Sequence, residues 1–286
     1  MKKIEIYKIG NDIGVNNNKI DKILLKVTGL SKSQLFLCDE IDEKYVEELK
    51  NCFIRYTKGE PIEFIINNAE FYGLDFYVDN RVLIPRNDTE IMVDKAIETI
   101  KNCDDKITLI DVGTGSSNIV ISVMKNVTDI NNELNCYAIE LSKEALEVSK
   151  INIEKHLLTE KINIFCGDLL EPIIENKFEL NKNLVVTANL PYIKDGDYQN
   201  MDIETVFYEP DIALYGGKLT GFELYERIIV QVLELKKLYD LSKIVLFIEI
   251  GFDQKEISKD YLNNKGLKFE VFNDNYGIER CVRIEM

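Results

Sequence analysis

The segment Asn189-Leu190-Pro191-Tyr192 carries residue types and a spacing that suit one specific chemistry. The apolar run 184–188 before it predicts a strand, so the four residues would lie where that strand ends. A planar nitrogen, in an amide or an aromatic amine, is a poor nucleophile because its lone pair is delocalised, and a site must turn that lone pair toward the acceptor. The side-chain oxygen of Asn189 can accept one N–H and the backbone carbonyl of Leu190 the other, since Pro191 favours an extended conformation at Leu190. Tyr192 can cover the planar group and exclude water.

A turn after a buried strand is the simpler interpretation of the same segment, because asparagine and proline are common turn residues. Hydride transfer has no use for the arrangement described above, whereas the transfer of a methyl group from a sulfonium to nitrogen needs it. The segment therefore favours methyl transfer over nicotinamide chemistry.

A second group of residues predicts a binding site for a nucleoside cofactor. The run Gly113-Thr114-Gly115-Ser116-Ser117 follows a strand and precedes a helix, so the backbone can approach a ligand and the helix start offers free N–H groups. Glu140 ends the next strand, where a carboxylate can accept hydrogen bonds from both ribose hydroxyls. Asp168 and Leu169 follow the third strand and would lie beside the adenine, Asp168 accepting from its amino group. Taken singly, each stretch is also explained by a tight turn or a helix cap.

The elements that would position these residues alternate from residue 107 onward. Strand-like runs and helical stretches follow one another, which is typical of an α/β protein with a mostly parallel sheet. The predicted strands are 107–111, 136–140, 162–166, 184–188 and 244–250, and the clearest helices are 142–156 and 221–237. Residues 266–272 and 280–284 are expected to pair as an antiparallel finish to the sheet.

The part of the chain before residue 85 differs in its hydrophobic period. Residues 1–61 show helical spacing around 20–27 and 45–56 and are expected to form a small helical domain. Residues 62–84 are rich in aromatic and β-branched types and contain the pair Asn67-Asn68, which predicts a β-hairpin linker. The catalytic domain would then span 85–286, beginning with a helix capped by Asn87 or Asp88, with Glu90 in capping-box spacing.

Composition narrows the classes of partner and location. The chain has 286 residues and a formal net charge of -15, which argues against a long nucleic-acid duplex as partner. It has no apolar run long enough for a membrane span and no export signal at its amino end, so we expect a cytoplasmic protein. Its six cysteines form no Cys-x-x-Cys pair and His156 is the only histidine, so we expect neither a metal site nor a disulfide framework. Nothing implies an oligomer.

Taken in order, several motifs resemble those of the S-adenosylmethionine-dependent methyltransferases with a seven-stranded, Rossmann-like sheet. Within that class they are similar to the peptide chain release factor glutamine methyltransferases (PrmC/HemK), over nearly the whole chain. The motifs are Lys58-Gly59-Glu60-Pro61-Ile62, Phe71-Tyr72-Gly73-Leu74, Leu83-Ile84-Pro85-Arg86-Asn87-Asp88-Thr89-Glu90, Asp111-Val112-Gly113-Thr114-Gly115, Asn189-Leu190-Pro191-Tyr192, Tyr208-Glu209-Pro210, Ala213-Leu214, Gly216-Gly217 and Glu249-Ile250-Gly251.

The resemblance implies a function, a substrate-recognition role for the helical domain of residues 1–61, and a set of site residues. The reaction would be methylation, by S-adenosylmethionine, of the glutamine side-chain amide in the Gly-Gly-Gln motif of class 1 bacterial release factors. Phe71 and Arg86 would lie near that glutamine, although a core aromatic is the more ordinary explanation of Phe71. Glu90 is equally explained by a capping box, and Glu209 by the bracing of a loop.

Two positions depart from the family pattern, and two other functions stay open. Ser117 stands where the family usually has glycine, which we expect to weaken cofactor binding, and Leu190 stands where it usually has proline. The resulting Asn-Leu-Pro-Tyr also resembles the ribosomal RNA adenine dimethyltransferases, but those place their helical domain after the catalytic one and tend to be basic. A protein that binds S-adenosylmethionine without catalysis is the remaining alternative.

Overall fold

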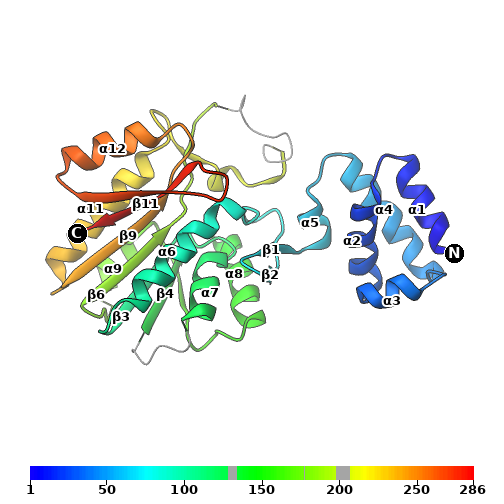
Figure 1. The fold of residues 1–286 in the computed structure, drawn as a ribbon, viewed down its shortest axis with the longest axis horizontal. Helices are drawn as coiled ribbons and strands as arrows, with labels where there is room; N and C mark the ends of the chain where they lie inside the picture. The colour runs from blue at the N-terminus through cyan, green and yellow to red at the C-terminus, as the bar shows by residue number, and fades with distance from the viewer. Residues whose placement is uncertain (128–133, 177, 198–206) are drawn as a thin grey trace.

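A computed structural model describes residues 1–127, 134–176, 178–197 and 207–286 (Figure 1). Figure 1 shows a group of helices at one end of the molecule and a twisted sheet with flanking helices at the other. The first group comprises α1 (Lys3–Asp12), α2 (Asn17–Thr28), α3 (Lys32–Leu37), the 3₁₀ turn η1 (Glu43–Tyr45), α4 (Val46–Thr57) and α5 (Ile62–Ile66).

The helices of the amino-terminal part pack around a core of their own. Helix α2 buries Ile20, Ile23 and Leu24, as its hydrophobic period predicts, and α4 buries Leu49 and Phe53 against them. The positions of α2 and α4 confirm the helices expected from the sequence.

The segment expected as a hairpin linker is a strand pair over only part of its length. Residues 62–66 form helix α5 rather than a strand, because burial of their apolar side chains in two different cores outweighs their β-branched composition. Asn67, with φ of 50°, ends that helix and does not form the hairpin turn. The hairpin is β1 (Ala69–Phe71) with β2 (Leu74–Phe76), and its two turn residues, Tyr72 and Gly73, both have positive φ.

The part of the chain from residue 90 onward is built on a seven-stranded sheet in the order β10-β11-β9-β6-β3-β4-β5. The five predicted parallel strands are present, and β10 and β11 add the predicted antiparallel finish, with β11 lying between β10 and β9. The bounds are β3 (Ile107–Val112), β4 (Leu134–Glu140), β5 (Asn163–Cys166), β6 (Asn183–Ala188), β9 (Lys243–Glu249), β10 (Lys268–Asn273) and β11 (Glu279–Glu285).

Helices cover both faces of this sheet, so successive side chains of its central strands enter two separate cores. Leu109 of β3 packs in the core that α6 and α7 share, whereas Ile110 packs in the core that α9 and α11 share. The helices are α6 (Glu90–Lys101), α7 (Asn118–Asn126), α8 (Lys143–Lys155), α9 (Glu171–Asn176), α11 (Glu223–Leu238) and α12 (Lys255–Asn264). The protein is therefore an α/β protein with a Rossmann-like sheet. No helix among the described residues is both long and apolar enough to cross a membrane.

Helix α6 begins differently from the capping box that the sequence predicts. It follows a 3₁₀ turn, η2 (Asn87–Thr89), and no side chain caps either element. The carboxylate of Glu90 instead accepts a hydrogen bond from the backbone N–H of Tyr72 at 2.9 Å. Glu90 thus ties the hairpin to the start of α6. The short strands β7 (Ile193–Lys194) and β8 (Tyr215–Gly217) and the turn η3 (Asp211–Ala213) complete the edge of the sheet where the candidate site lies.

Candidate active site

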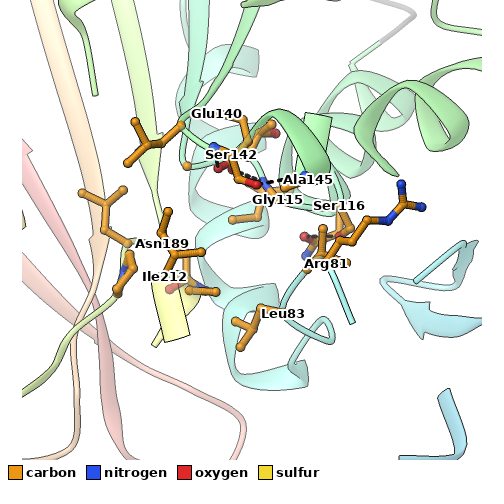
Figure 2. A pocket seen from close by; sticks show the side chains of 18 of the residues that line it. Arg81, Leu83, Gly115, Ser116, Glu140, Ser142, Ala145, Asn189 and Ile212 are labelled. Carbon is orange, nitrogen blue, oxygen red and sulfur yellow. Dashed lines mark hydrogen bonds between the residues drawn. The ribbon is translucent and has the colours of Figure 1, made fainter. Parts of the chain in front are cut away.

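A pocket opens at the carboxyl ends of β3, β4, β5 and β6, where ligands of open α/β sheets bind (Figure 2). It brings together most of the residues singled out in the sequence. Those that line it are Arg86, Gly113, Thr114, Gly115, Ser116, Glu140, Asp168, Leu169, Asn189, Leu190 and Pro191. Ser117, Tyr192 and Phe71 do not line this pocket.

The glycine loop is held close to the segment that follows β6. Gly113 has a φ of +68°, and a Cβ at this position would lie 2.8 Å from Cδ2 of Leu190. Beneath the loop, the buried carboxylate of Asp111 accepts hydrogen bonds from the hydroxyls of Thr114 at 2.6 Å and Thr187 at 2.7 Å. Burial raises the pKa of Asp111 to about 6. Asp111 therefore braces the loop from behind rather than facing a ligand.

Ser117 points away from the pocket, contrary to the expectation that its side chain would disturb the cofactor. The residue adopts a left-handed conformation with φ of 62°. Its hydroxyl is fully buried and hydrogen-bonds with Ser149 of α8 at 2.8 Å. The hydroxyl oxygen of Thr114 lies 3.2 Å from that of Ser117. The side chain that replaces the usual glycine thus joins the loop to α8 and leaves the pocket floor bare.

Glu140 lies at the pocket wall with both carboxylate oxygens engaged by backbone groups. One oxygen accepts from the N–H of Gly115 and the other from the N–H of Ser142, each at 2.9 Å (Figure 2). Burial raises the pKa of Glu140 in spite of these bonds. Since each carboxylate oxygen has a further lone pair, Glu140 can still accept from a ligand's hydroxyls.

Asp168 is less free than the sequence suggested. Its Oδ2 accepts a hydrogen bond from the guanidinium of Arg227 on α11 at 2.7 Å. The neighbouring Leu169 is buried at the pocket, with a φ of 50°. One oxygen of Asp168 is therefore held toward Arg227, and Leu169 offers an apolar surface.

The side chain of Asn189 is held at its nitrogen end. Its Nδ2 donates to the hydroxyl of Thr89 at 3.1 Å, and that hydroxyl donates to the carboxylate of Glu249 at 2.6 Å. Since Nδ2 is engaged with the protein, Oδ1 is the end that can serve the pocket as an acceptor.

The backbone of Leu190 is bound by a residue that the sequence did not single out. The hydroxyl of Tyr225, on α11, donates to the carbonyl of Leu190 at 2.9 Å and lies 3.1 Å from its N–H, which donates to it. The ring of Tyr225 is completely buried. The carbonyl expected to accept from a substrate therefore already accepts one hydrogen bond and has one lone pair left for another.

Tyr192 and Arg86 belong to a second hollow that adjoins the first. Tyr192 lines it together with Glu209 and Gly251, and Arg86 lies at the border of both hollows. Arg86 forms an ion pair with the buried carboxylate of Glu209 at 2.7 Å, and the other oxygen of Glu209 accepts from the N–H of Ile84 at 3.0 Å. Glu209 thus fixes the backbone and side chain of the segment that precedes α6.

Phe71 is buried in the core beneath the hairpin and makes aromatic contacts with Tyr72 and Phe76. It also borders a third, polar hollow that Arg86 shares. These contacts match the core explanation of Phe71.

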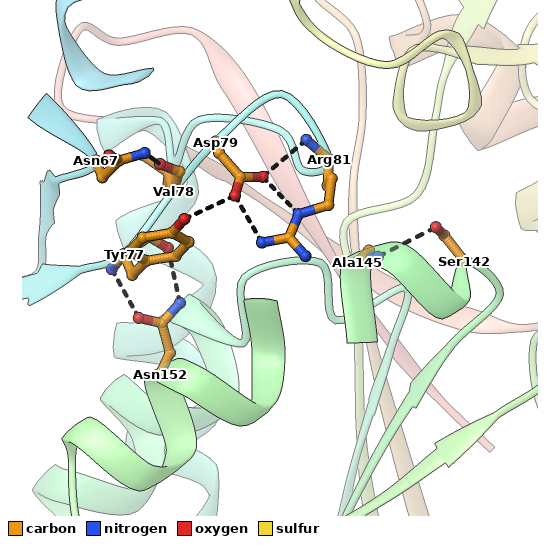
Figure 3. Close-up of polar contacts among 8 residues, drawn as sticks. All are labelled: Asn67, Tyr77, Val78, Asp79, Arg81, Ser142, Ala145 and Asn152. Carbon is orange, nitrogen blue, oxygen red and sulfur yellow. Dashed lines mark hydrogen bonds and ion pairs between the residues drawn. The ribbon is translucent and has the colours of Figure 1, made fainter. Parts of the chain in front are cut away.

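The linker and the glycine loop are joined by one buried amide that sequence analysis missed. Asn152 of α8 accepts from the N–H of Tyr77 at 2.7 Å and donates to its carbonyl at 2.9 Å (Figure 3). The same Nδ2 donates to the carbonyl of Ser116 at 2.9 Å. Next to this contact, Asp79 binds Arg81, whose side chain lines the pocket (Figure 3).

Glu249 and Thr89 stand in motifs of the family resemblance but received no role, and Glu249 is also a charged residue ending an apolar strand. Tyr225 and Asn152 carry no local signal, because their partners lie far away in the sequence. Among the described residues, no group of histidine, cysteine, aspartate and glutamate side chains is arranged to hold a metal ion.

Comparisons with known proteins agree with this geometry. A scan against protein-family models finds no match. The release factor glutamine methyltransferase of Bacillus subtilis (strain 168) is 31% identical over 278 residues, which cover 95% of this chain and 92% of the relative. That of Clostridium botulinum (strain Hall) is 36% identical over 285 residues, which cover 98% of this chain and 96% of the relative. The chain belongs to the release factor glutamine methyltransferase family.

A solved structure shares the fold at low identity. The N-terminal domain of human METTL16, in complex with SAH, superposes with a TM-score of 0.50 at 17% identity, covering 86% of this chain and 84% of that one. The Rossmann-like sheet expected from the family resemblance is therefore present, and the enzyme class is that of its methyltransferase relatives.

Proposed function

We propose that this protein transfers a methyl group from S-adenosylmethionine to the side-chain amide nitrogen of the glutamine in the Gly-Gly-Gln motif of class 1 bacterial release factors. The proposal rests on the orientation of Asn189 in a chain of this family. Its Nδ2 donates to Thr89, so that its Oδ1 is the end that can serve the pocket. An enzyme with this substrate acts in the cytoplasm, where translation takes place.

The pocket residues fit an S-adenosylmethionine molecule. Gly113 and Gly115 keep the floor free of side chains, the carboxylate of Glu140 can accept from ribose hydroxyls, and Leu169 offers an apolar surface to the adenine. SAH, the demethylated product of this cofactor, is present in the METTL16 structure of similar fold. When bound, the cofactor supplies an electrophilic methyl group on a sulfonium.

The residues of this chain would orient the amide nitrogen. Asn189 accepts one N–H through Oδ1, and the remaining lone pair of the Leu190 carbonyl accepts the other, so that the nitrogen lone pair faces the methyl group. Tyr192, which lines the adjoining hollow, would cover the planar amide. Such alignment of reactants is worth up to ~7 to 11 kcal/mol of the barrier. The methylated nitrogen is acidic, and its proton leaves to water or through Asn189.

The test is a labelling experiment with three parallel substrates. Purified protein is incubated with methyl-labelled S-adenosylmethionine and a full-length release factor, the same factor with alanine in place of the Gly-Gly-Gln glutamine, or ribosomal RNA. We expect label on the intact release factor alone. Label on RNA would instead support the adenine methyltransferase, and cofactor binding without any transfer would support a non-catalytic binding protein.

A further inference from the structure

Three elements meet behind Asn189. Strands β6 and β9 are parallel neighbours, and their register pairs Ala188 with Ile248, so the next residues, Asn189 and Glu249, emerge side by side at the carboxyl edge of the sheet. Thr89, at the start of α6, hydrogen-bonds with both of these residues. Nothing in the proposed chemistry has yet assigned a role to Glu249.

The hydrogen bonds among these three side chains have a defined direction. A carboxylate has only acceptors, so the Thr89 hydroxyl must donate its hydrogen to Glu249, at 2.6 Å. The hydroxyl then has only lone pairs to offer Asn189, which obliges the amide to present Nδ2, at 3.1 Å. Through Thr89, Glu249 therefore determines that Nδ2 of Asn189 faces the protein and that Oδ1 is left for the pocket.

This carboxylate lies in a nearly dry environment. Glu249 is 3% exposed and Thr89 1% exposed. Burial raises the pKa of Glu249 to about 7, Arg280 of β11 lowers it and Asp88 of η2 raises it. Tyr192, Tyr225 and Cys281 are the other titratable groups that face it. The guanidinium of Arg280 pairs with Asp88 at 3.3 Å and with Asp274 at 3.6 Å.

We propose that Glu249 is a positioning residue for methyl transfer, which as a carboxylate holds Asn189, through Thr89, with Oδ1 toward the pocket. The inference rests on the proposed function, because its value to catalysis depends on Asn189 accepting an N–H of the substrate amide. A proton on Glu249 adds a donor to the cluster, so that a hydroxyl or an amide must turn around. The rate of methyl transfer therefore rises with pH through the range in which Glu249 ionises and levels off above it.

The first measurement compares Glu249→Gln with the wild type. The glutamine side chain has the same shape as glutamate but carries an N–H donor. This donor favours a reversed Asn189 amide, with Oδ1 toward Thr89 and residue 249 and Nδ2 toward the substrate. We expect single-turnover methylation of a release factor to fall ~100-fold, the loss typical of a misplaced group. The affinity for SAH should stay unchanged, and the rise in rate with pH should disappear. Glu285→Gln, the same chemical change in β11 beside Arg283, should behave as the wild type.

Thr89 offers a second pair of variants. Thr89→Ser keeps the hydroxyl and should retain activity, whereas Thr89→Val removes it at similar volume and should lose activity with SAH binding intact. Wild-type rates and pH dependence in Glu249→Gln would overturn the inference. Equal losses in both Thr89 variants would do the same.

A substrate-free measurement separates this inference from the proposed function. The side-chain ¹⁵N amide resonance of Asn189, assigned by its loss in Asn189→Ala, should shift with pH in the wild type with a midpoint near the pKa of Glu249, and should not shift in Glu249→Gln. If the chemical shift of this resonance does not change with pH in the wild type, the positioning role is refuted. Absence of label on the release factor in the wild type, with the resonance titrating as expected, would instead refute the proposed substrate.

Discussion

At the scale of single residues, Asn189 lines the pocket and, in the proposed function, orients the substrate amide. Replacing it by alanine removes the acceptor for the substrate N–H but no group that we expect to hold the cofactor's ribose or adenine. Asn189→Ala should therefore lower the methylation rate ~100-fold and leave SAH affinity, measured by calorimetry, nearly unchanged. A parallel loss of both would show that Asn189 mainly binds the cofactor.

Glu249 makes the stability of the folded protein depend on pH. Its pKa is raised to about 7 from the model-compound value of 4.5, chiefly by burial. Between these values the folded state keeps a proton that the unfolded chain has released, so the free energy of unfolding falls as pH rises. The full loss, on the order of 3 kcal/mol, is reached above pH 7.

The same substitution used for the activity test checks this. Glu249→Gln cannot ionise, so its free energy of unfolding in urea should fall less than that of the wild type between pH 4.5 and pH 8. Asp111, whose pKa is raised to about 6, contributes a pH dependence to both proteins and cancels in the comparison. Parallel curves for the two proteins would contradict the raised pKa of Glu249.

At the scale of elements, the glycine loop and the segment after β6 are packed too closely for a side chain at Gly113. Gly113→Ala adds the cost of a positive φ, ~1 kcal/mol, and a contact at 2.8 Å with Leu190. Gly29, the C-cap of α2, has φ of +70° and no atom within 4 Å of an added Cβ.

The two alanine variants therefore form a matched pair. Gly29→Ala should lower the free energy of unfolding only by the cost of the positive φ and leave the SAH affinity unchanged. Gly113→Ala should also displace Leu190 or the loop and weaken SAH binding ~10-fold or more, measured by calorimetry. If both variants bind SAH as the wild type does, the close packing of Gly113 against Leu190 does not affect cofactor binding.

The parallel strands were predictable because strands buried on both faces appear as continuous apolar runs bounded by turns. Helix α5 was not, since Ile62 and Ile65 owe their helical state to the core they enter rather than to their propensity. The acceptor role of Glu90 was missed for a similar reason, because its partner is Tyr72 of the hairpin and not its own helix.

The pocket residues followed from the ends of predicted strands, but their hydrogen-bond partners did not. The carbonyl of Leu190 is bound by Tyr225, 35 residues away, and Thr89 lies 100 residues from Asn189. Ser117 was assigned to the pocket from its place in the loop, and only the left-handed backbone turns its hydroxyl toward Ser149. Side-chain direction in a loop depends on the dihedral angles that a motif does not specify.

At the scale of the whole molecule, the amino-terminal helices have a core separate from those of the sheet. The division into a recognition domain (1–61), a linker (62–84) and a catalytic domain (85–286) remains a prediction. Phe53→Ala, in the first core, should cost ~3 to 5 kcal/mol of local stability and abolish methylation of a release factor while SAH binding persists.

Phe247→Ala, in β9 of the sheet, is the comparison. Both phenylalanines are completely buried, so the lost apolar volume is the same. We expect this second variant to lose SAH binding and methylation together. If Phe53→Ala also abolished SAH binding, the two parts of the chain would form a single folding unit.

The Nδ2 of Asn152 donates hydrogen bonds to two carbonyl groups, that of Tyr77 in the segment before α6 and that of Ser116 in the glycine loop. Under the proposed function, a partner that displaces Tyr77 on docking would therefore change the free energy with which the loop binds the cofactor. Thermodynamic linkage makes that effect reciprocal, so a partner that tightens cofactor binding by some factor is itself bound more tightly, by the same factor, once the cofactor is present. Under the proposed function, the Asn152 side chain would couple the binding of the cofactor to that of the protein substrate.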